Sequence, residues 1–371
     1  MLKFTCEKAL LVSAISVASR TVAAKSPIAV LEGIYLQAGM QLRMTGYNME
    51  TGVTVTVPAE VTEVGECVMP ARLFFDIVRR LPDEPVTVSV DDGMKVSVIC
   101  GISAFHFSAD QAQDYPELPS VEDARLLAEM PQRVLREMIG GTLFAVSEQA
   151  TRPIHTGVLF EKAEGSWTAV STDGFRLALR RWTPEQAAEG NEKFVVPAAA
   201  LREVEKILED TDEPVKISRT KLHILFQIGD AQLVCRVLEG EFMDWRKVLV
   251  RDTPIKMTGS VSALASTLER VGLMVNEKYK SPVRCLFGKD TAEFRTDTAL
   301  GSARDRCTLA GDGKDLEIGF NCRYLLDALR VIDTDDVLIE LTNSLSPIIM
   351  TPADGKDTFT YLVLPVRVKT E

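Results

Sequence analysis

The sequence predicts an α+β protein made of three related domains, and two features of the 371-residue chain predict it. A long amphipathic helix pattern occurs three times, and each copy is followed by strand patterns, a second helix pattern and further strand patterns. The whole unit recurs every ~125 residues, which is too long for a solenoid repeat and suits a small domain. Three copies of one fold in one chain favour a symmetric object, and the object that we expect is a ring.

The first helix of each repeat is predicted from apolar residues at close to helical spacing. The three patterns cover residues 8–24, 131–146 and 261–275. Pro131 suits the first turn of a helix, because the N–H that it lacks would have no partner there. We therefore expect each repeat to open with a helix.

Strands are predicted where apolar and polar residues alternate. Residues 52–58 alternate strictly, which is typical of a half-buried strand. Residues 86–90 and 94–98 flank Asp91-Asp92-Gly93, and this combination predicts a hairpin with a glycine turn. The corresponding strands of the third repeat are predicted at residues 337–341 and 359–368.

The second helix of each repeat begins with Pro or Asn and is predicted at residues 70–81, 197–208 and 321–332. Each unit thus consists of helix, strands, helix and strands. This order predicts an antiparallel sheet on one side of the domain and two helices on the other.

Polar segments near residues 120–128 and 251–256 mark the domain boundaries, and neither is of low complexity. The predicted domains therefore cover residues 1–122, 128–252 and 254–371, joined by short ordered linkers.

The composition is that of an ordinary globular protein, with 46% hydrophobic and 26% charged residues. No apolar run is long enough to span a bilayer, and the first residues enter a strand pattern at once, so we expect no signal peptide and a cytoplasmic location. The seven cysteines are scattered singly, which favours buried reduced thiols. The three histidines are far apart, so we expect no metal site and no cofactor.

The charge is distributed unevenly. The net charge is −11, which taken alone argues against nucleic acid, but the six helix windows hold thirteen bases against six acids. Residues 8–25 contain no acid at all. The helices together carry about +7 on an acidic body, so they could line a channel for DNA. The alternative is that these bases lie on ordinary solvated helix faces.

Several motifs, taken together and in order, resemble the bacterial DNA polymerase III beta subunit family, the sliding clamps. The resemblance covers the whole chain and all three repeats. The motifs are residues 69–76 (MPARLFFD), 171–178 (STDGFRLA), 276–278 (NEK), 318–326 (IGFNCRYLL) and 361–367 (YLVLPVR).

The resemblance implies a head-to-tail homodimer in which six domains close into a ring, twelve helices line the hole, and sheets form the rim. Such a ring encircles duplex DNA without sequence preference and tethers the polymerase, so it needs no catalysis. The implied partners are the DNA polymerase III alpha subunit, the clamp loader, and other polymerases and repair proteins that carry short hydrophobic motifs. The chain has no phosphate-binding G-x-x-x-x-G-K-[ST] loop, so a separate loader would hydrolyse the ATP.

The resemblance also implies a partner-peptide groove between the second and third repeats. It would have one wall from the 171–178 motif and the opposite wall from the C-terminal motif, with a short apolar pocket for a Leu or Phe of the partner. For Leu177, Val248 and Leu364 the alternative is ordinary core. The implied groove residues are His155, Thr172, Gly174, Phe175, Arg176, Leu177, Met243, Val248, Asn321, Tyr324, Leu364, Pro365, Val366 and Arg367.

This sequence departs from the family pattern in the groove. Phe175 stands where many members carry His, and Met243 stands where Pro is common. Lys247 stands where Arg is frequent, and Pro347 replaces a small polar residue. We expect the groove to persist with an altered partner preference.

Further positions match DNA contacts or the ring joint. An aromatic pair expected after Arg152 is Pro153-Ile154 here, which argues against stacking on single-stranded template. For the joint, Phe105 and Phe107 of one subunit should meet Leu273 and Met274 of its neighbour; intradomain core is the alternative. The DNA candidates are Lys25, Arg72, Arg79, Arg80, Arg133, Arg136, Gln149, Arg152 and Lys206.

Two other functions stay open. A hydrolase or transferase could use the region of Asp173 and Arg176, but the chain lacks a G-x-S-x-G or H-E-x-x-H motif. A clamp-like paralogue could keep the ring and serve another role, such as resistance to a clamp-binding inhibitor, and the altered groove residues motivate it. Asp91-Asp92 and residues 333–336 could be read as metal carboxylates, but hairpin and loop positions explain them.

Overall fold

The computed structural model describes residues 1–149, 151–185, 190–249, 252–275, 282–299 and 301–367. All six predicted helices are present, and each is shorter than its sequence pattern. The first ends at Ala18 because the chain tightens there into a 3-10 turn, Ser19–Thr21. The helices are α1 (Lys8–Ala18), α2 (Ala71–Val78), α3 (Gln132–Leu143), α4 (Ala198–Ile207), α5 (Val261–Gly272) and α6 (Cys322–Leu329).

Each repeat opens with a strand, so the expectation of an opening helix was wrong. In the first repeat Leu2, Phe4 and Cys6 alternate into the core, and their strand pairs with β7 (Val86–Val90). The sequence analysis noted the strand pattern at the start of the chain but not the strands that precede the first helices of the second and third repeats, since so few residues of alternation give a weak signal beside a longer helix pattern. The three opening strands are β1 (Leu2–Cys6), β10 (Arg125–Pro131) and β18 (Ile255–Ser260).

The last predicted strand is also shorter than expected. It is β23 (Phe359–Val363), whereas the sequence pattern ran to residue 368, which lies outside the described residues. Pro365 lacks the N–H that a strand position would donate, so the regular ladder ends before it.

The chain forms two compact units, one of Met1–Leu135 with Ala199–Val237 and the other of Arg136–Ala198 with Leu238–Glu371. The middle repeat is thereby divided, and strand pairing explains why. One half extends the sheet of the first repeat, because β17 (Ala231–Arg236) pairs with β4 (Thr51–Val57). The other half extends the sheet of the third repeat.

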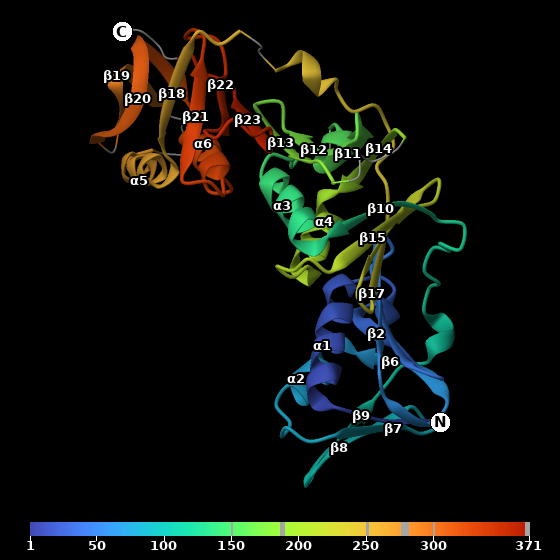
Figure 1. Ribbon diagram of the computed structural model, residues 1–371. Coiled ribbons are helices and arrows are strands. Elements are labelled where there is room, and N and C mark those ends of the chain that lie inside the picture. The colour runs from blue at the N-terminus through green and yellow to red at the C-terminus, as the bar shows by residue number, and fades with distance from the viewer. Residues whose placement is uncertain (150, 186–189, 250–251, 276–281, 300, 368–371) are drawn as a thin grey trace. The chain divides into compact units, whose positions relative to one another are not determined.

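The first unit contains two antiparallel sheets, and α1 and α2 lie side by side beside them (Figure 1). Leu11 and Ile15 of α1 and Phe74 and Val78 of α2 are fully buried in the core. One sheet has the order β5-β1-β7-β8-β9, with β5 (Glu60–Glu63), β8 (Lys95–Cys100) and β9 (Ser103–Ser108). The other has the order β10-β15-β16-β17-β4-β3-β2-β6, with β15 (Pro214–Arg219), β16 (His223–Ile228), β3 (Leu42–Tyr47), β2 (Gly33–Ala38) and β6 (Gly65–Pro70).

The second unit contains one long antiparallel sheet that joins the two repeats in it. The joining pair is β13 (Arg176–Trp182) and β23, in which Arg176 lies opposite Val363 and Arg180 opposite Phe359. The order is β14-β11-β12-β13-β23-β22-β21-β18-β20-β19, with β14 (Glu192–Pro197), β11 (Gly157–Ala163), β12 (Ser166–Thr172), β22 (Ile348–Pro352), β21 (Asp336–Leu341), β20 (Gly301–Phe320) and β19 (Val283–Thr298).

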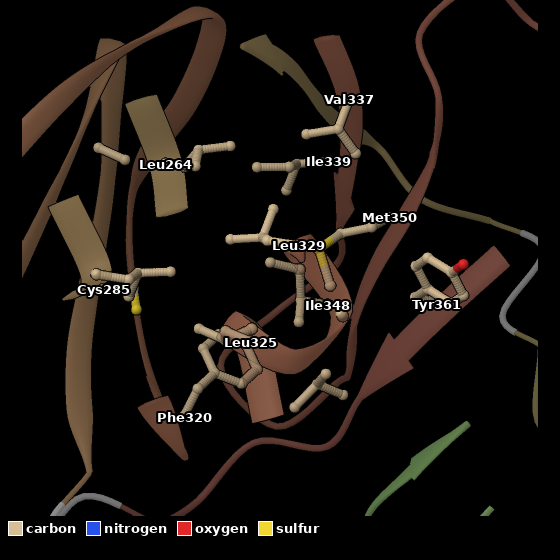
Figure 2. Packing of buried hydrophobic residues seen from close by; sticks show 14 of the residues in the cluster. Leu264, Cys285, Phe320, Leu325, Leu329, Val337, Ile339, Ile348, Met350 and Tyr361 are labelled. Carbon is tan, nitrogen blue, oxygen red and sulfur yellow. The ribbon is translucent and has the colours of Figure 1, made fainter. Parts of the chain in front are cut away.

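The core of the third repeat lies between this sheet and the adjacent helices α5 and α6. Figure 2 shows Leu325 and Leu329 of α6 among side chains from the strands. Both helices begin with a side-chain cap, since the Ser260 hydroxyl accepts from the N–H of Ala263 and the Asn321 side chain accepts from that of Arg323. Such caps satisfy N–H groups that the helix itself cannot.

All seven cysteines are free, and only Cys307 is partly exposed. Burial raises the pKa of the Cys67 and Cys235 thiols to about 12, so both stay protonated at neutral pH. The structure thus confirms the expectation of buried reduced thiols for six of the seven. No helix within the described residues is long and apolar enough to cross a membrane.

Gly46 of β3 packs directly against the end of α1, so Gly46→Ala should destabilise the protein. A Cβ on Gly46 would lie 1.9 Å from the carbonyl oxygen of Ala18. The helix would have to move, at a cost of about 2 kcal/mol. Gly39→Ala is the matched control, because a Cβ there meets nothing within 4 Å. Urea unfolding should show a lower midpoint for the Gly46 variant alone; equal midpoints for both variants would contradict this packing.

Candidate peptide-binding groove

The turn between β12 and β13 is held by its own side chains. The Thr172 hydroxyl donates to the carbonyl oxygen of Arg176 at 2.7 Å and accepts from the N–H of Gly174 at 3.1 Å. Asp173 Oδ1 accepts from the N–H groups of Phe175 and Arg176, at 2.9 and 3.0 Å. Gly174 has a φ of +89°, a conformation that glycine adopts without strain. The turn therefore holds Phe175 in place with 58% of it exposed.

Arg176 is buried below this turn and is paired on every side. Its Nε donates to Asp173 Oδ2 at 3.0 Å and its guanidinium donates to Asp327 Oδ2 at 2.7 Å. The guanidinium carbon lies 4.4 Å from the ring centre of Tyr324 and 5.3 Å from that of Phe144. Because Asp327 and Tyr324 belong to α6, Arg176 ties this helix to the middle repeat.

Arg180 makes a second tie on the same face of β13, four residues further on. Its Nε donates to the Tyr361 hydroxyl at 2.9 Å, and its other nitrogens donate to Asp333 Oδ2 at 3.1 Å and to the carbonyl oxygen of Val331 at 2.8 Å. Its guanidinium lies over the ring of Phe359. Burial raises the pKa of the Tyr361 phenol to about 12, so this hydroxyl stays neutral.

The C-terminal segment runs beside the turn rather than across a groove from it, so the expectation of two opposite walls was wrong. The N–H of Leu364 donates to the carbonyl oxygen of Phe175 at 2.9 Å, and that of Val366 donates to Gly319 at 2.8 Å. The antiparallel pairing of β13 with β23 simply continues past the last strand residue. Turn and tail thus form one wall together.

A cavity of about 880 Å³ lies between this wall and the helices α5 and α6. Phe175 stacks against Tyr324, with 6.4 Å between the ring centres, and the two form an aromatic surface at its mouth. Six of the predicted groove residues line it: Phe175, Asn321, Tyr324, Leu364, Pro365 and Val366. The cavity is also lined by residues that the sequence analysis did not assign to the groove, among them Leu273, which it assigned to the ring joint: Glu269, Gly272, Leu273, Val275, Cys322, Arg323, Leu326, Asp327 and Arg330.

The remaining apolar candidates lie in a neighbouring cluster on the other face of the sheet. Leu177 and Leu362 form part of its floor, and Met243 and Val248 pack over them partly buried. Leu177 is only 2% exposed, so it supports the groove from below and is not an open wall. Leu364 belongs to both this cluster and the cavity, so the two features adjoin.

His155 lies at the border of this cluster. Its ring packs edge-to-face on Phe242, with 5.0 Å between the centres, and its Nδ1 is buried without a hydrogen-bond partner among the described residues. Burial lowers the pKa of His155, and the positive charge of Arg152 lowers it further. A neutral imidazole is therefore favoured here.

Thr172, Gly174 and Arg176 shape the turn and do not line the cavity, whereas Arg367 is exposed at the end of the described tail. The missed residues of α5 and α6 share one signal. They recur three or four positions apart on each helix, which places them on one helix face. The 276–278 motif lies outside the described residues.

The nine DNA candidates fall into two groups. Lys25, Arg72, Arg136 and Arg152 are exposed, and none forms an ion pair within the described ranges. The other cations are paired at the surface: Arg79 and Arg80 share Asp76, Arg133 pairs with Asp212, and Lys206 pairs with Glu203. Gln149 is exposed in the segment after α3.

The joint candidates lie on exposed edges. Phe105 and Phe107 belong to β9, the edge strand of its sheet, where they lie opposite Val98 and Val96. Residues opposite each other share a face of the sheet, and these valines are buried. Phe105 thus lies on the core-facing side of the strand and is still 41% exposed.

Leu273 and Met274 follow the end of α5. Leu273 is 79% exposed, and Met274 is half-buried. The sheet of this unit also ends in an edge strand, β19. The first unit therefore presents an exposed apolar side chain, Phe105, on an edge strand, and the second presents Leu273 just after α5.

Comparison with known proteins decides the family. Sequence models of the N-terminal, central and C-terminal domains of the DNA polymerase III beta subunit match residues 2–119, 129–244 and 246–367. The beta sliding clamp of Staphylococcus epidermidis is 29% identical, with 99% of this chain and 100% of that protein covered. The chain belongs to the DNA polymerase III beta subunit family.

Solved structures agree with this assignment. The DNA polymerase sliding clamp of Bacillus subtilis is 26% identical, covers 99% of this chain and 100% of its own, and has a TM-score of 0.94. The Pseudomonas aeruginosa sliding clamp bound to griselimycin is 29% identical, with the same coverage and a TM-score of 0.92.

Family membership confirms three repeated clamp domains with antiparallel sheets. Beta subunits are the non-catalytic processivity factor of DNA polymerase III, and this chain is a processivity clamp of that kind. A hydrolase or transferase that uses Asp173 and Arg176 is thereby excluded. Both residues hold the turn and α6 in place instead.

Arg176→Met should destabilise this clamp strongly. The change leaves the partly buried Asp173 without its cation and leaves Asp327 with only Arg323, at 3.8 Å, which costs about 3 kcal/mol. Lys356→Met is the control, because Lys356 pairs with Asp354 at the exposed surface and its loss should be barely measurable. Urea unfolding of both variants checks this, and similar midpoints would show that the buried network contributes little.

His155 should make the clamp less stable in mild acid. Its folded-state pKa lies below the ordinary value of 6.5, so the unfolded chain takes up the proton first as the pH falls. Stability is then lost progressively below pH 6.5, and His155→Gln should reduce this loss. Burial and the positive charge of Arg236 also lower the pKa of His223, so this residue should contribute in the same way. Thermal unfolding at pH 7.5 and 5.5 measures this loss of stability. If the double variant His155→Gln/His223→Gln loses as much stability as the wild type, the prediction is wrong.

Proposed function

We propose that this clamp encircles duplex DNA as a head-to-tail homodimer and binds its partners through the groove between turn, tail and α6. The implied partners are the DNA polymerase III alpha subunit, the clamp loader, and other polymerases and repair proteins that carry short hydrophobic motifs. The role places the protein with the bacterial chromosome in the cytoplasm. The observation that carries the proposal is the groove itself, a cavity of about 880 Å³ beside an exposed aromatic pair.

The groove suits a short peptide with one or two apolar side chains. Its rigid turn and tail need no ordering on binding, which reduces the entropic cost of association. Leu364 and Val366 offer apolar surface, and Phe175 and Tyr324 offer ring faces. The side of the groove that α5 and α6 form adds an ion pair, in which the Arg330 guanidinium lies 2.9 Å from the Glu269 carboxylate. Apolar anchors surrounded by polar groups are typical of peptide hot spots.

The DNA candidates suit sliding. Exposed Lys and Arg on helices can meet successive phosphates without reading the bases. Four of the cations are already paired with surface carboxylates, and such pairs contribute little free energy. They can exchange a carboxylate for a phosphate at small cost. Weak, delocalised contacts then hold the duplex inside a ring without stopping its movement.

The exposed edges support the ring joint. Phe105 on the core-facing side of β9 lacks a cover in its own subunit, and Leu273 at the end of α5 is an exposed apolar side chain. Joining the two edges would cover both and pair two open strands. Because the two edges differ, a head-to-tail contact between them can repeat, and it closes with two subunits when each contact rotates the chain by half a turn.

Leu273→Asp should open the joint. A carboxylate in place of Leu273 would be buried against the neighbour's apolar edge, so the ring should dissociate. The wild type should have a solution mass near twice 40.9 kDa, and the variant a mass near 40.9 kDa. Leu345→Asp is the matched control, since Leu345 is 78% exposed and lies in the turn before β22. A wild-type monomer at micromolar concentration would contradict the joint.

The function is tested by DNA synthesis on a primed circular template with the cognate polymerase and loader. The wild type should lengthen the products of single binding events. A variant that lacks the tail from Leu364 onward should lose this effect and keep its dimeric mass, because the groove wall is gone. Failure of the wild type with a working loader would contradict the proposal.

A second candidate is a clamp-like paralogue with an altered groove, and the exposed stack of Phe175 on Tyr324 favours it. Fluorescence polarisation with a labelled tail peptide of the cognate polymerase separates the two. If the wild type binds the peptide tightly and the tail deletion abolishes binding, the result supports the housekeeping role. If the protein is dimeric but does not bind the peptide, the result supports the paralogue.

A further inference from the structure

Residues 241–249, here named the wall segment, carry Met243 and Val248 over the apolar cluster beside the cavity. Their backbone hydrogen bonds join Lys247 to Asp244 and Val248 to Trp245. These bonds shape the segment and do not tie it to the sheet. The buried side chains of Phe242 and Trp245 anchor the segment in the cluster, so side chains and not the backbone set its position above the sheet.

Side chains make that connection. Trp245 is 3% exposed, and its Nε1–H donates to Glu161 Oε2 at 3.1 Å. Arg246 donates to the same oxygen at 3.1 Å, and its guanidinium carbon lies 4.2 Å from the centre of the Trp245 ring. Glu161 belongs to β11, so one carboxylate joins two consecutive residues of the wall segment to the sheet.

The space next to this connection is open. A cavity of about 350 Å³ is lined by Trp245, Arg246 and Leu249 of the wall segment and by side chains of the sheet, among them Arg181 and Ile349. Trp245 packs in the apolar cluster on one side and borders this open space on the other. If its bond to Glu161 were lost, the indole could shift toward the open space, and Met243 and Val248 could shift with it.

We propose that Glu161 is a positioning residue for partner binding: through Trp245 and Arg246 it holds the wall segment at the height that the partner peptide needs. The proposal rests on the proposed function and adds that the bound peptide extends from the cavity past Leu364 to Met243 and Val248. Glu161 itself touches no part of the 880 Å³ cavity. It acts only through the segment that it holds.

The test compares Glu161→Ala with Glu161→Gln in the full-length dimer. The probe is a fluorescein-labelled peptide from the C-terminal tail of the cognate polymerase, followed by polarisation. Glu161→Ala should raise the Kd about tenfold, because a charge-assisted bond and an indole bond are both lost. Glu161→Gln should stay within about threefold of the wild type, since its amide oxygen can still accept from Trp245. Glu129→Gln, a surface carboxylate paired with Lys216 at 3.8 Å, is the control and should have no effect.

Hydrogen exchange separates positioning from general destabilisation. In Glu161→Ala the amides of the wall segment should exchange faster, while those of β11 and β12 keep their protection. Trp245→Phe removes the N–H and keeps an aromatic side chain of smaller size, so it should also weaken binding, and its effect should not simply add to that of Glu161→Ala. Unchanged peptide affinity in Glu161→Ala overturns the proposal, and so does faster exchange over the whole sheet.

The two proposals fail in different ways. If the wild type does not bind the peptide, the proposed function fails. If the wild type binds and Glu161→Ala binds equally well, only the positioning role fails. The exchange measurement needs no peptide, so it tests the connection between Glu161 and the wall segment in either case.

Discussion

The site depends on two guanidinium groups buried in one strand. Arg176 and Arg180 cannot lie in a low-dielectric environment without partners, and their partners come from the third repeat, Asp327 for one and Asp333 for the other. Aromatic rings complete each environment, with Tyr324 facing Arg176 at 4.4 Å. Any rotation of the third repeat against the middle one would separate Arg180 from Asp333 and leave Arg176 with Asp173 alone. The junction is therefore fixed by electrostatics as well as by the pairing of β13 with β23.

Because side chains alternate between the two faces of a strand, β13 has two structural roles. On one face of β13, Arg176 and Arg180 hold α6 and the tail in register. On the other face, Leu177 and Leu179 form the floor on which the wall segment packs. Since neighbouring residues of a strand point to opposite faces, fixing one face fixes the other. The aromatic mouth at Phe175 and the apolar cluster beyond Leu364 are thus held in a constant relation by one strand and its turn.

Local periodicity was enough to predict the six helices and the α+β class, and the motifs were enough to predict the family. Local periodicity could not predict contacts between residues that are distant in sequence. Trp245 and Glu161 are 84 positions apart, and no local pattern marks them as partners. For Leu177 the sequence left both the groove wall and ordinary core open, and its neighbours on β11, β12 and β23 decide for the core. By contrast, the pairing of Asp76 with Arg79 and Arg80 follows from helical spacing and could have been predicted.

That pairing bears on how an acidic protein can hold DNA. A channel of unpaired cations would bind phosphates strongly and release many counterions, so the duplex would stop moving. Where Asp76 lies between two arginines, each phosphate must compete with a carboxylate already in place, and the net gain is small. The same reasoning applies to Lys206 beside Glu203. In the proposed ring, which could not fall off its substrate, such weak contacts would be sufficient.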